Sequence, residues 1–389
     1  MSERELTSTE AMFQIMRTIQ ILGFSAAARY TAPTKLVATA DLYDSDNNVV
    51  ESGAGKGPDS LIGALAESIE HFSTFQPAVE STWQSTEAVA MQQEASLDGI
   101  IKSLPQGEPI ECLRLISLNE RDELLVPSAL LSPGIAQASY QGNCHAMQFL
   151  ARYSSNSGIA FGCTKNEALL HGTQELIERH ILSLFFMAVC GIGPKMDFYS
   201  PSLSLLREAL LNDPLAIERA RALQVIIIKD VMSVYFAVAF SRAGPGSYHL
   251  SPIGSGCSLD IGTAIQRAVT EQFQSQDLYD SNEESLDRKT LDLLSCSNSL
   301  KNLIDFAPVR LLKLPELQPS TFRCVATVSS QLGTLRKALA DSGKKIFHRT
   351  VASFSTNCIV TQAYIPGLER FNIIRNGRLV VPQHILRSN

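Results

Sequence analysis

The sequence predicts an α/β (mixed α+β) fold, with helices and strands interleaved along the chain. The first observation is a small, glycine-containing segment that occurs three times, at residues 52–57, 154–163 and 254–256, each time before a helical pattern. The second is a set of short segments rich in β-branched and aromatic residues between these units, which are typical of strands. The third is a hydrophobic content of 45%, which is that of a globular chain with a sizeable core.

The N-terminal part is predicted to start with an amphipathic helix over residues 8–22, in which Met12, Met16 and Ile19 recur at helical spacing. A strand is expected at 36–43, followed by the first glycine-containing turn. The patterns after that turn predict helices at 60–72 and 82–104 and strands at 112–118 and 124–131.

Residues 154–179 are the segment around which the rest of the prediction is organised. The first half is polar and contains Gly158 and Gly162, whose small size lets a ligand approach the backbone. The second half has an apolar stripe typical of a helix, with Asn166 as the expected N-terminal cap. Glu175 and Glu178 lie three residues apart, which places both carboxylates on one face of that helix.

The C-terminal half again alternates strands and helices. Strands at 225–229 and 234–240 are expected to pair as a hairpin, and a helix at 261–276 follows the third glycine segment. A polar stretch at 278–300, rich in Ser, Asn and Asp, is predicted to be a loop. The remaining expected elements are helices at 203–211 and 332–342 and strands at 322–329, 346–353, 357–365 and 379–381.

No linker divides the chain, so we expect a single domain over residues 1–389. Its four parts are an N-terminal helix and strand (1–45), a core that holds the three glycine segments (46–276), a polar loop (277–300) and a C-terminal α/β part (301–389).

The composition excludes several classes of function. The net charge of −6 provides no basic surface for nucleic acid. No apolar run reaches membrane-spanning length, and the N-terminus lacks a signal-peptide pattern, so a cytoplasmic protein is expected. The 8 cysteines are scattered without zinc-binding spacing, which predicts mostly buried free thiols.

The three predicted glycine-linked helices carry acidic or amide side chains three residues apart. These pairs are Glu67/Glu70, Glu175/Glu178 and Glu271/Gln274. A lone Glu-x-x-Glu is most often a solvated helix face, but carboxylates that converge repel one another unless a cation neutralises them. Oxygen ligands of this kind suit Mg²⁺, and Mg²⁺ with several carboxylates suits a polyphosphate. Lys56, Arg179 and Arg267 could then meet the phosphate charge.

Other catalytic signatures are incomplete in the sequence. The segment at 53–57 is not a P-loop, because that motif needs glycine at Val50 and a hydroxyl at Gly57. The Gly-x-Ser-x-Gly elbow of hydrolases does not occur. Cys163 and Cys257 lie beside glycine clusters, and a structural thiol is the preferred interpretation of both over a nucleophile.

Three sequence blocks, within about residues 50–371, resemble those of the YcaO family. They are the Gly-Lys-Gly turn at 55–57 that leads to ESIE, the loop SNSGIAFG at 155–162 that leads to ELIER, and the helix RAVTEQFQ at 267–274. The string IPGLERF at 365–371 also fits the family.

The chain departs from the family pattern at several positions. Gly63 stands where the family often has Ser, and His71 and His180 replace the usual Arg and Asp. Ser157 is a local insertion that blurs which polar residue of the loop meets a nucleotide. Many azoline-forming members end in a proline-rich tail, whereas only Pro382 lies near the end here, which leaves room for thioamide formation.

The resemblance implies a YcaO-type fold with a central ATP site formed by three glycine-turn–helix blocks. The implied Mg²⁺ ligands are Glu67, Glu70, Glu175, Glu178 and Glu271. The implied nucleotide contacts are Ser52, Lys56, Ser155, Asn156, Arg179, Arg267 and Gln274. Arg179, Arg267 and Glu178 are implied to act in catalysis.

The resemblance also implies an activity and partners. Such an enzyme uses ATP, which becomes ADP and phosphate, to phosphorylate the oxygen of a backbone amide in a ribosomally made precursor peptide. Attack by a neighbouring Cys, Ser or Thr gives a thiazoline or oxazoline, the expected product, whereas external sulfide would give a thioamide. A ubiquitin-activating-like partner that binds the leader peptide, and a flavin-dependent dehydrogenase that makes azoles, are implied as members of a hetero-complex. Two alternatives stay open: a non-catalytic peptide-binding scaffold and an ordinary ATP-dependent ligase.

Overall fold

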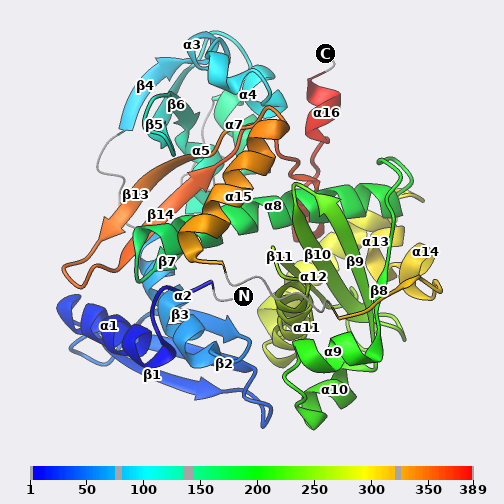
Figure 1. The fold of residues 1–389 in the computed structure, drawn as a ribbon. Helices are drawn as coiled ribbons and strands as arrows, with labels where there is room; N and C mark the ends of the chain where they lie inside the picture. The colour runs from blue at the N-terminus through cyan, green and yellow to red at the C-terminus, as the bar shows by residue number, and fades with distance from the viewer. Residues whose placement is uncertain (1–2, 75–80, 135–143, 320–325, 388–389) are drawn as a thin grey trace.

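The computed structural model describes residues 3–74, 81–134, 144–319 and 326–387, and a long helix crosses the middle of the molecule (Figure 1). This helix, α8 (Lys165–Val189), is buried on all sides because sheets and helices pack around it. Thr164 caps its N-terminus by accepting a hydrogen bond from the backbone N–H of Glu167. The expected cap at Asn166 is therefore wrong, since Asn166 lies inside the first turn. Within the described ranges, no helix is both long and apolar enough to cross a bilayer.

The N-terminal part forms a three-stranded antiparallel sheet. Its strands run in the order β1 (Ser25–Tyr30), β2 (Val37–Tyr43) and β3 (Val49–Lys56), and helices α1 (Ser8–Ile21) and α2 (Ser60–Thr74) pack against them. The helices predicted at 8–22 and 60–72 and the strand at 36–43 are confirmed. Strand β1 is not predicted by the sequence, because SAAARY is weak in strand-forming residues.

The first glycine cluster is a strand and not a turn, which corrects the sequence-based prediction. A Cβ atom at Gly55 would lie 1.8 Å from the carbonyl oxygen of Ser60, and one at Gly53 would lie 2.3 Å from that of Ala64. Glycine is required at both positions because α2 lies directly on β3. Glycine is usually depleted in strands, which is why the sequence alone favours a turn.

The same arrangement recurs in a second three-stranded antiparallel sheet, made of β9 (Leu223–Val231), β10 (Val234–Ser241) and β11 (Ile253–Ser258). Helix α11 (Ile261–Asp277) lies on β11, and a Cβ atom at Gly254 would be 2.2 Å from the Ala268 carbonyl oxygen. The predicted hairpin of 225–229 with 234–240 and the helix at 261–276 are confirmed. Helices α9 (Leu203–Ala209) and α10 (Pro214–Ala220) add apolar residues to the core of this unit.

A third, larger sheet is antiparallel in the order β4–β5–β13–β14–β7, with β6 paired to β5. Its strands are β4 (Ser81–Ser85), β5 (Pro109–Ser117), β6 (Glu123–Pro127), β7 (Ile159–Gly162), β13 (Phe347–Ser353) and β14 (Ile359–Tyr364). Helix α8 packs on β7 and β14, and α15 (Val328–Asp341) packs on α8. The third sheet therefore places the loop before β7 beside the central helix.

Short elements connect these units. They are α3 (Thr86–Ala90), η1 (Gln93–Ala95), α4 (Gly99–Lys102), α5 (Ser128–Leu131), α7 (His145–Tyr153), β8 (Ser200–Pro201), α12 (Ser281–Ser295), α13 (Asn302–Asp305), α14 (Ala307–Arg310), β12 (Glu316–Leu317), η2 (Phe371–Asn376) and α16 (Gln383–Leu386).

Several expectations for these connecting regions are wrong. Residues 82–104 form β4, α3, η1 and α4 instead of one helix. The polar segment at 277–300 is mostly helix α12 and not a loop. Asp280 caps this helix, and only Thr290 and Leu294 are buried, so it has no apolar stripe that the sequence could show. Residues 379–381 do not form a strand. Half of the strand expected at 322–329 lies outside the described residues, and the described half is not a strand, because α15 begins at Val328. The single-domain organisation over 1–389 stays a prediction.

The cysteines agree with the expectation of mostly buried free thiols. Seven lie in the described residues and none is in a disulfide there. Five of these are buried, Cys144 is half-buried and Cys296 is exposed, while Cys324 lies outside the described residues.

Candidate functional site

A cavity of about 570 Å³, called the large cavity below, is lined by residues of α2, α8 and α11. These are the three helices that carry the paired acidic and amide side chains. The glycines of β3 and β11 bring α2 and α11 close to their sheets, and α8 crosses the molecule above both units (Figure 1). The volume is in the range of sites that bind small molecules.

The large cavity brings together most of the residues predicted from the sequence. Those that line it are Lys56, Glu67, Glu70, Glu175, Glu178, Arg179, Arg267 and Gln274. Glu271 stands next to them, since its carboxylate forms an ion pair with Lys56.

The two glutamates of α2 are each held by a backbone amide from a neighbouring strand. Glu67 accepts a hydrogen bond from the N–H of Ala54 at 2.7 Å, and Glu70 accepts one from the N–H of Phe161 at 3.0 Å. Each bond uses a single carboxylate oxygen. The side chains are thus oriented by β3 and β7, and the other oxygen of Glu67, Oε1, lies 3.7 Å from Nε2 of His71.

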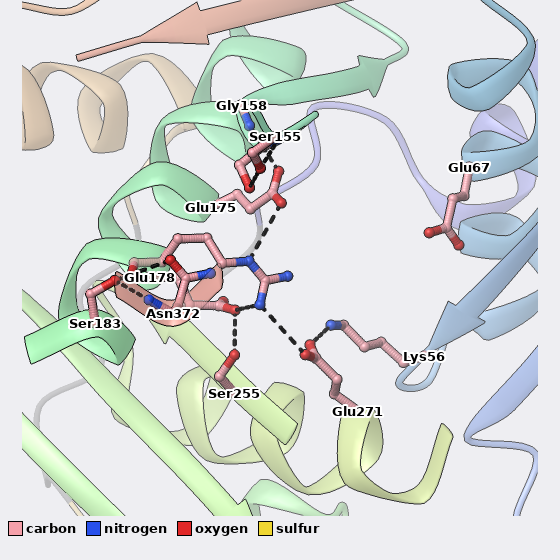
Figure 2. Close-up of polar contacts among 12 residues, drawn as sticks. Lys56, Glu67, Ser155, Gly158, Glu175, Glu178, Ser183, Ser255, Glu271 and Asn372 are labelled. Atoms are coloured by element: carbon pink, nitrogen blue, oxygen red, sulfur yellow. Dashed lines mark hydrogen bonds and ion pairs between the residues drawn. The ribbon is translucent and has the colours of Figure 1, made fainter. Parts of the chain in front are cut away.

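On α8, the guanidinium of Arg179 lies among the carboxylates of Glu175, Glu178 and Glu271, which Figure 2 labels. Its Nε is 3.7 Å from Glu175 Oε1, and its Nη1 is 3.8 Å from Glu178 Oε1 and 4.0 Å from Glu271 Oε1. Glu175 also accepts a hydrogen bond from the N–H of Gly158 at 3.1 Å, and Glu178 accepts one from the hydroxyl of Ser255 at 2.7 Å. Residues from α8, α11, β11 and the loop before β7 therefore meet around one cation.

The cations settle the charge state of only part of this site. Burial alone would raise the pKa of Glu271, but Lys56 and Arg179 outweigh that effect and lower it, so this carboxylate stays ionised. Burial opposes the charge of Arg179, yet Glu178, Glu271 and Glu175 raise its pKa above the usual value. Glu271 and the two cations beside it, Lys56 and Arg179, therefore stabilise one another in their charged forms.

The other carboxylates are left short of positive charge. Burial raises the pKa of Glu70 well above its usual value, and Glu175 and Glu67 raise it further. Burial also raises the pKa of Glu67 and of Glu175, despite the nearby His71 and Arg179. Such carboxylates are stabilised either by a proton or by a bound cation.

This donor set fits a divalent, oxygen-preferring cation such as Mg²⁺. The side chains that would hold it are carboxylates, and the large cavity has room for further oxygen ligands. Within the described part of the chain, no three acidic, histidine or cysteine side chains already stand at metal-binding spacing. The fit therefore rests on the chemistry and the unmet charge of the carboxylates.

Arg267 is engaged by the N-terminal segment of the chain. Its Nη2 forms an ion pair with the buried carboxylate of Glu3, and its Nη1 donates to Gln174 Oε1 at 3.0 Å and to the carbonyl of Cys257 at 2.8 Å. Glu3 also accepts hydrogen bonds from Gln174 at 2.9 Å and from the hydroxyl of Ser258 at 2.7 Å. Nη1 and Nη2 of Arg267 are thus engaged by the protein, so a phosphate that binds through Nη2 would have to displace Glu3.

Three predicted nucleotide contacts do not line the large cavity. Ser52 is exposed on β3 and donates its hydroxyl proton to Asp41 of the neighbouring strand β2 at 2.7 Å. Ser155 and Asn156 lie on the other side of Arg179, next to a second cavity. Their assignment to the nucleotide stays a prediction that the geometry of the large cavity does not favour.

Sequence reasoning missed several polar residues that line the large cavity, among them Glu3, Arg4, Glu167, His171 and Gln174. The last three have a recognisable signal, since 167, 171, 174 and 178 follow helical spacing on α8. Burial lowers the pKa of His171 to about 4 and raises that of Glu167 to about 7. Glu3 has no such signal, because its contacts are all distant in sequence.

The histidines and cysteines singled out in the sequence have structural roles. Buried His180 accepts a hydrogen bond from the N–H of Glu369 at 3.0 Å, and burial lowers its pKa to about 3. His71 bonds to the carbonyl of Ser52 at 3.0 Å. A hydrogen bond with Cys358 raises the pKa of Cys163, and burial raises that of Cys257, so both thiols stay protonated.

Comparison with known families gives a match that covers most of the chain. A family model described as YcaO cyclodehydratase, ATP- and Mg²⁺-binding, matches residues 53–369. A search of curated proteins found no match.

Solved structures share the fold at low sequence identity. The YcaO from Methanopyrus kandleri, bound with AMPPCP and Mg²⁺, has a TM-score of 0.64 and 17% identity, with 97% of this chain and 95% of that chain covered. A heterocyclase in complex with substrate and cofactor has a TM-score of 0.61 and 18% identity over 95% of this chain. The chain spans 54% of the length of that heterocyclase. The E. coli microcin synthetase McbBCD complex has a TM-score of 0.55 and 14% identity, with 92% and 95% covered.

Proposed function

The chain belongs to the YcaO family, and from that premise we propose that it activates backbone amides of a ribosomally synthesised precursor peptide. As a member of this family it is an enzyme that uses ATP, with Mg²⁺ as its metal cofactor. The product that we propose is a thiazoline or oxazoline ring, formed by cyclodehydration of Cys, Ser or Thr.

One observation carries this proposal: carboxylates in excess of their cations line a single large cavity. The pKa values of Glu67, Glu70 and Glu175 are all raised, with burial as the main cause. Keeping such charges buried has a cost that only a function repays. A non-catalytic scaffold has no need of them, which favours the enzyme over that alternative.

The roles that we assign follow from the contacts. Mg²⁺ would be held by Glu67, Glu70, Glu175, Glu178 and Glu271. The nucleotide would be met by Lys56, Arg179, Arg267 and Gln274. When bound, ATP supplies the phosphoryl group that turns the amide oxygen into a leaving group after a nucleophile has added to the carbonyl.

Arg179 is the residue best placed to stabilise charge during the reaction. Three carboxylates fix its guanidinium before any ligand arrives, so little reorganisation is needed when negative charge develops nearby. Glu178 orients Arg179 and is itself oriented by Ser255. Lys56 neutralises Glu271 in the described structure and would be available to a phosphate if Glu271 served as a metal ligand.

We further propose that the chain works in the cytoplasm within a hetero-complex. The McbBCD structure with pro-MccB17 bound is a complex of this kind, and it supports a peptide substrate here. A ubiquitin-activating-like protein would bind the leader peptide, and a flavin-dependent dehydrogenase could oxidise the rings to azoles.

The test is a reconstitution of the chain with Mg-ATP and with candidate partner and precursor-peptide products of the neighbouring genes. We expect ADP and phosphate to form and each modified residue to lose one water in the peptide mass. Exchange of oxygen for sulfur in the presence of sulfide would assign thioamide formation instead. ATP left intact by the complete mixture would contradict the enzyme and support a scaffold.

A further inference from the structure

A second cavity, of about 340 Å³, lies next to Glu175 and Arg179 and is called the small cavity below. These two side chains line both cavities and therefore form the wall between them. In Figure 2, Ser155 and Gly158 lie on one side of Glu175, while Lys56 and Glu271 lie on its opposite side. The loop before β7, helix α8 and helix η2 provide most of the remaining lining of the small cavity.

The small cavity differs from the large one in its charge. Glu175 is the single carboxylate among its lining residues, and Arg179 faces it at 3.7 Å. Arg375 and Arg378 also line the cavity, and no described residue forms an ion pair with either. They are held by carbonyl groups instead: Arg375 Nη2 donates to Ser251 at 3.0 Å and Arg378 Nη1 donates to Ser154 at 2.9 Å.

Two buried polar groups at this cavity have no hydrogen-bond partner among the described residues. They are Nη1 of Arg375 and the hydroxyl of Ser154, a residue that is 3% exposed. Burial also lowers the pKa of Arg375 to about 10, and Asp287 compensates for this only in part. Native proteins rarely leave buried donors unpaired, so two of them at one cavity indicate a ligand that supplies acceptor oxygens.

The remaining lining identifies the kind of ligand. Ser155, Asn156 and Asn372 offer hydroxyl and amide groups, which can both donate and accept hydrogen bonds. Leu182, Phe186 and Ile373 add apolar surface. Alternating carbonyl oxygens, amide protons and small side chains are the features of an extended peptide, whereas a polyphosphate would leave the apolar surface without a partner.

We propose that the small cavity binds the segment of the peptide substrate that carries the amide to be activated, with Arg375 and Ser154 donating hydrogen bonds to its backbone carbonyls. This inference rests on the proposed function, since it places the peptide on one side of Arg179 and the nucleotide on the other. It also gives Ser155 and Asn156 a role on the peptide side of that wall.

The test uses photo-crosslinking of a short probe, acetyl-Gly-Gly-Cys-Gly-photoleucine-Gly-amide, to the full chain with Mg²⁺ and a non-hydrolysable ATP analogue. Mass spectrometry then maps the labelled residues. We expect saturable labels within 154–157 and 372–378. Saturable labels confined to other parts of the chain, or no saturable labelling, would overturn the inference.

Two matched variants sharpen this test. Asn376→Trp places a large ring on an exposed residue that lines the small cavity, and we expect it to lower labelling about tenfold, the effect of 1.4 kcal/mol in binding. Asn282→Trp changes an equally exposed residue on α12 that lines neither cavity and should leave labelling unchanged. Equal labelling in both variants would contradict the inference.

A third variant separates binding from structure. Ser154→Ala removes a hydroxyl that has no partner among the described residues, so we expect labelling to fall while Tm stays the same or rises. A lower Tm with unchanged labelling would assign Ser154 a structural role and contradict the inference. Titration of Mg-ATP into each variant keeps the two proposals apart: normal nucleotide binding with misplaced labels sinks only the peptide site, whereas absent nucleotide binding by the wild type sinks the proposed function.

Discussion

The large and small cavities share one wall and have opposite chemistry. On one side of Arg179, four glutamates line the large cavity beside Glu3 and Glu167, and the pKa values of Glu67, Glu70 and Glu175 are raised. On the other side, Arg375 and Arg378 line the small cavity, where neither forms an ion pair with a described residue and Asp287 only partly offsets the burial of Arg375. The large cavity therefore has more carboxylates than cations, while the small one has two buried polar groups without a hydrogen-bond partner.

The contrast in charge between the two cavities indicates how Arg179 can act at both. Glu175, Glu178 and Glu271 hold Arg179 from the side of the large cavity, so its guanidinium is fixed whether or not the small cavity is filled. A cation bound to the glutamates would leave Arg179 freer to act on a group that arrives between the two cavities. Carboxylates thus lie on one side of Arg179 and the cationic Arg375 and Arg378 on the other. This arrangement supports the proposal that an amide is activated next to a phosphate.

The largest effect is expected from breaking the large cavity through its scaffold. Gly55→Val places a side chain where even a Cβ atom would lie 1.8 Å from the backbone of α2. We expect the free energy of unfolding to fall by about 3 kcal/mol or more, because a backbone has to move to make room. Denaturant unfolding measures the loss, and Gly333→Ala is the control.

The control glycine lies in helix α15, and a Cβ atom added there would meet nothing within 4 Å, so alanine should raise stability by about 0.5–1 kcal/mol. If Gly55→Val proved as stable as the wild type, the close approach of β3 and α2 would not be what holds Glu67 and Glu70 in the large cavity.

A smaller but more specific effect is expected from Glu70→Gln. The glutamine can still accept the hydrogen bond from Phe161, but it removes a buried charge that Glu175 and Glu67 repel. We expect the ligand-free protein to become more stable and Mg-ATP to bind about 100-fold more weakly, a loss of about 2.7 kcal/mol. Calorimetry and thermal unfolding on one preparation measure both.

Glu218→Gln is the matched control for this variant, because that side chain pairs with Arg221 on the surface of α10, away from both cavities. A Glu70→Gln protein that binds Mg-ATP as well as this control would remove Glu70 from the proposed metal ligands.

The pH dependence of stability and of Mg-ATP binding tests the charge state of Glu70 in the large cavity. The raised pKa of Glu70 means that the folded protein holds a proton which the unfolded chain has already lost above its ordinary value of 4.5. The contribution of this group to stability therefore falls as the pH rises from about 4.5 through its folded pKa. Mg-ATP should bind more tightly over the same window, since binding releases the proton.

Thermal unfolding of the wild type and Glu70→Gln across this pH range measures the difference. The gap in Tm between the two proteins should widen as the pH rises without ligand and narrow when Mg-ATP is present. A gap that is independent of pH would show that Glu70 is ionised at all these pH values.

The smallest effect separates two residues that the sequence places in the same motif. Lys56 lines the large cavity, whereas Ser52 faces Asp41 on the exposed side of β3. We expect Lys56→Ala to weaken Mg-ATP binding about tenfold and Ser52→Ala to change it less than about twofold. Equal losses in the calorimetric titration would put Ser52 back among the nucleotide contacts.

Much of this site could be predicted from the sequence because it depends on helical spacing. Glu67 and Glu70, Glu175 and Glu178, and Glu271 and Gln274 keep their relations along any helix, so their faces follow from the sequence alone. Lys56 lies at the end of β3, just before α2, and Arg179 follows Glu178 on α8, so the sequence also places both cations near these glutamates.

The parts that could not be predicted depend on contacts between distant segments. The sequence favours a turn at Gly53 and Gly55 because the reason for these glycines, the backbone of α2, is visible only in three dimensions. Glu3 meets Arg267 across 264 residues of chain, and no local pattern encodes that pair. Helix α12 escapes prediction because its two buried residues are too few to form an apolar stripe.

The most direct test of the central claim is a calorimetric titration of Mg-ATP into the purified chain, with its partner added, beside the Glu178→Gln variant. We expect the wild type to bind Mg-ATP only when Mg²⁺ is present, and the variant not to bind it. Glu178 lines the large cavity, and its Oε1 lies 3.8 Å from Nη1 of Arg179. Binding of equal strength by both proteins, or by the wild type without Mg²⁺, would contradict the convergent-glutamate site.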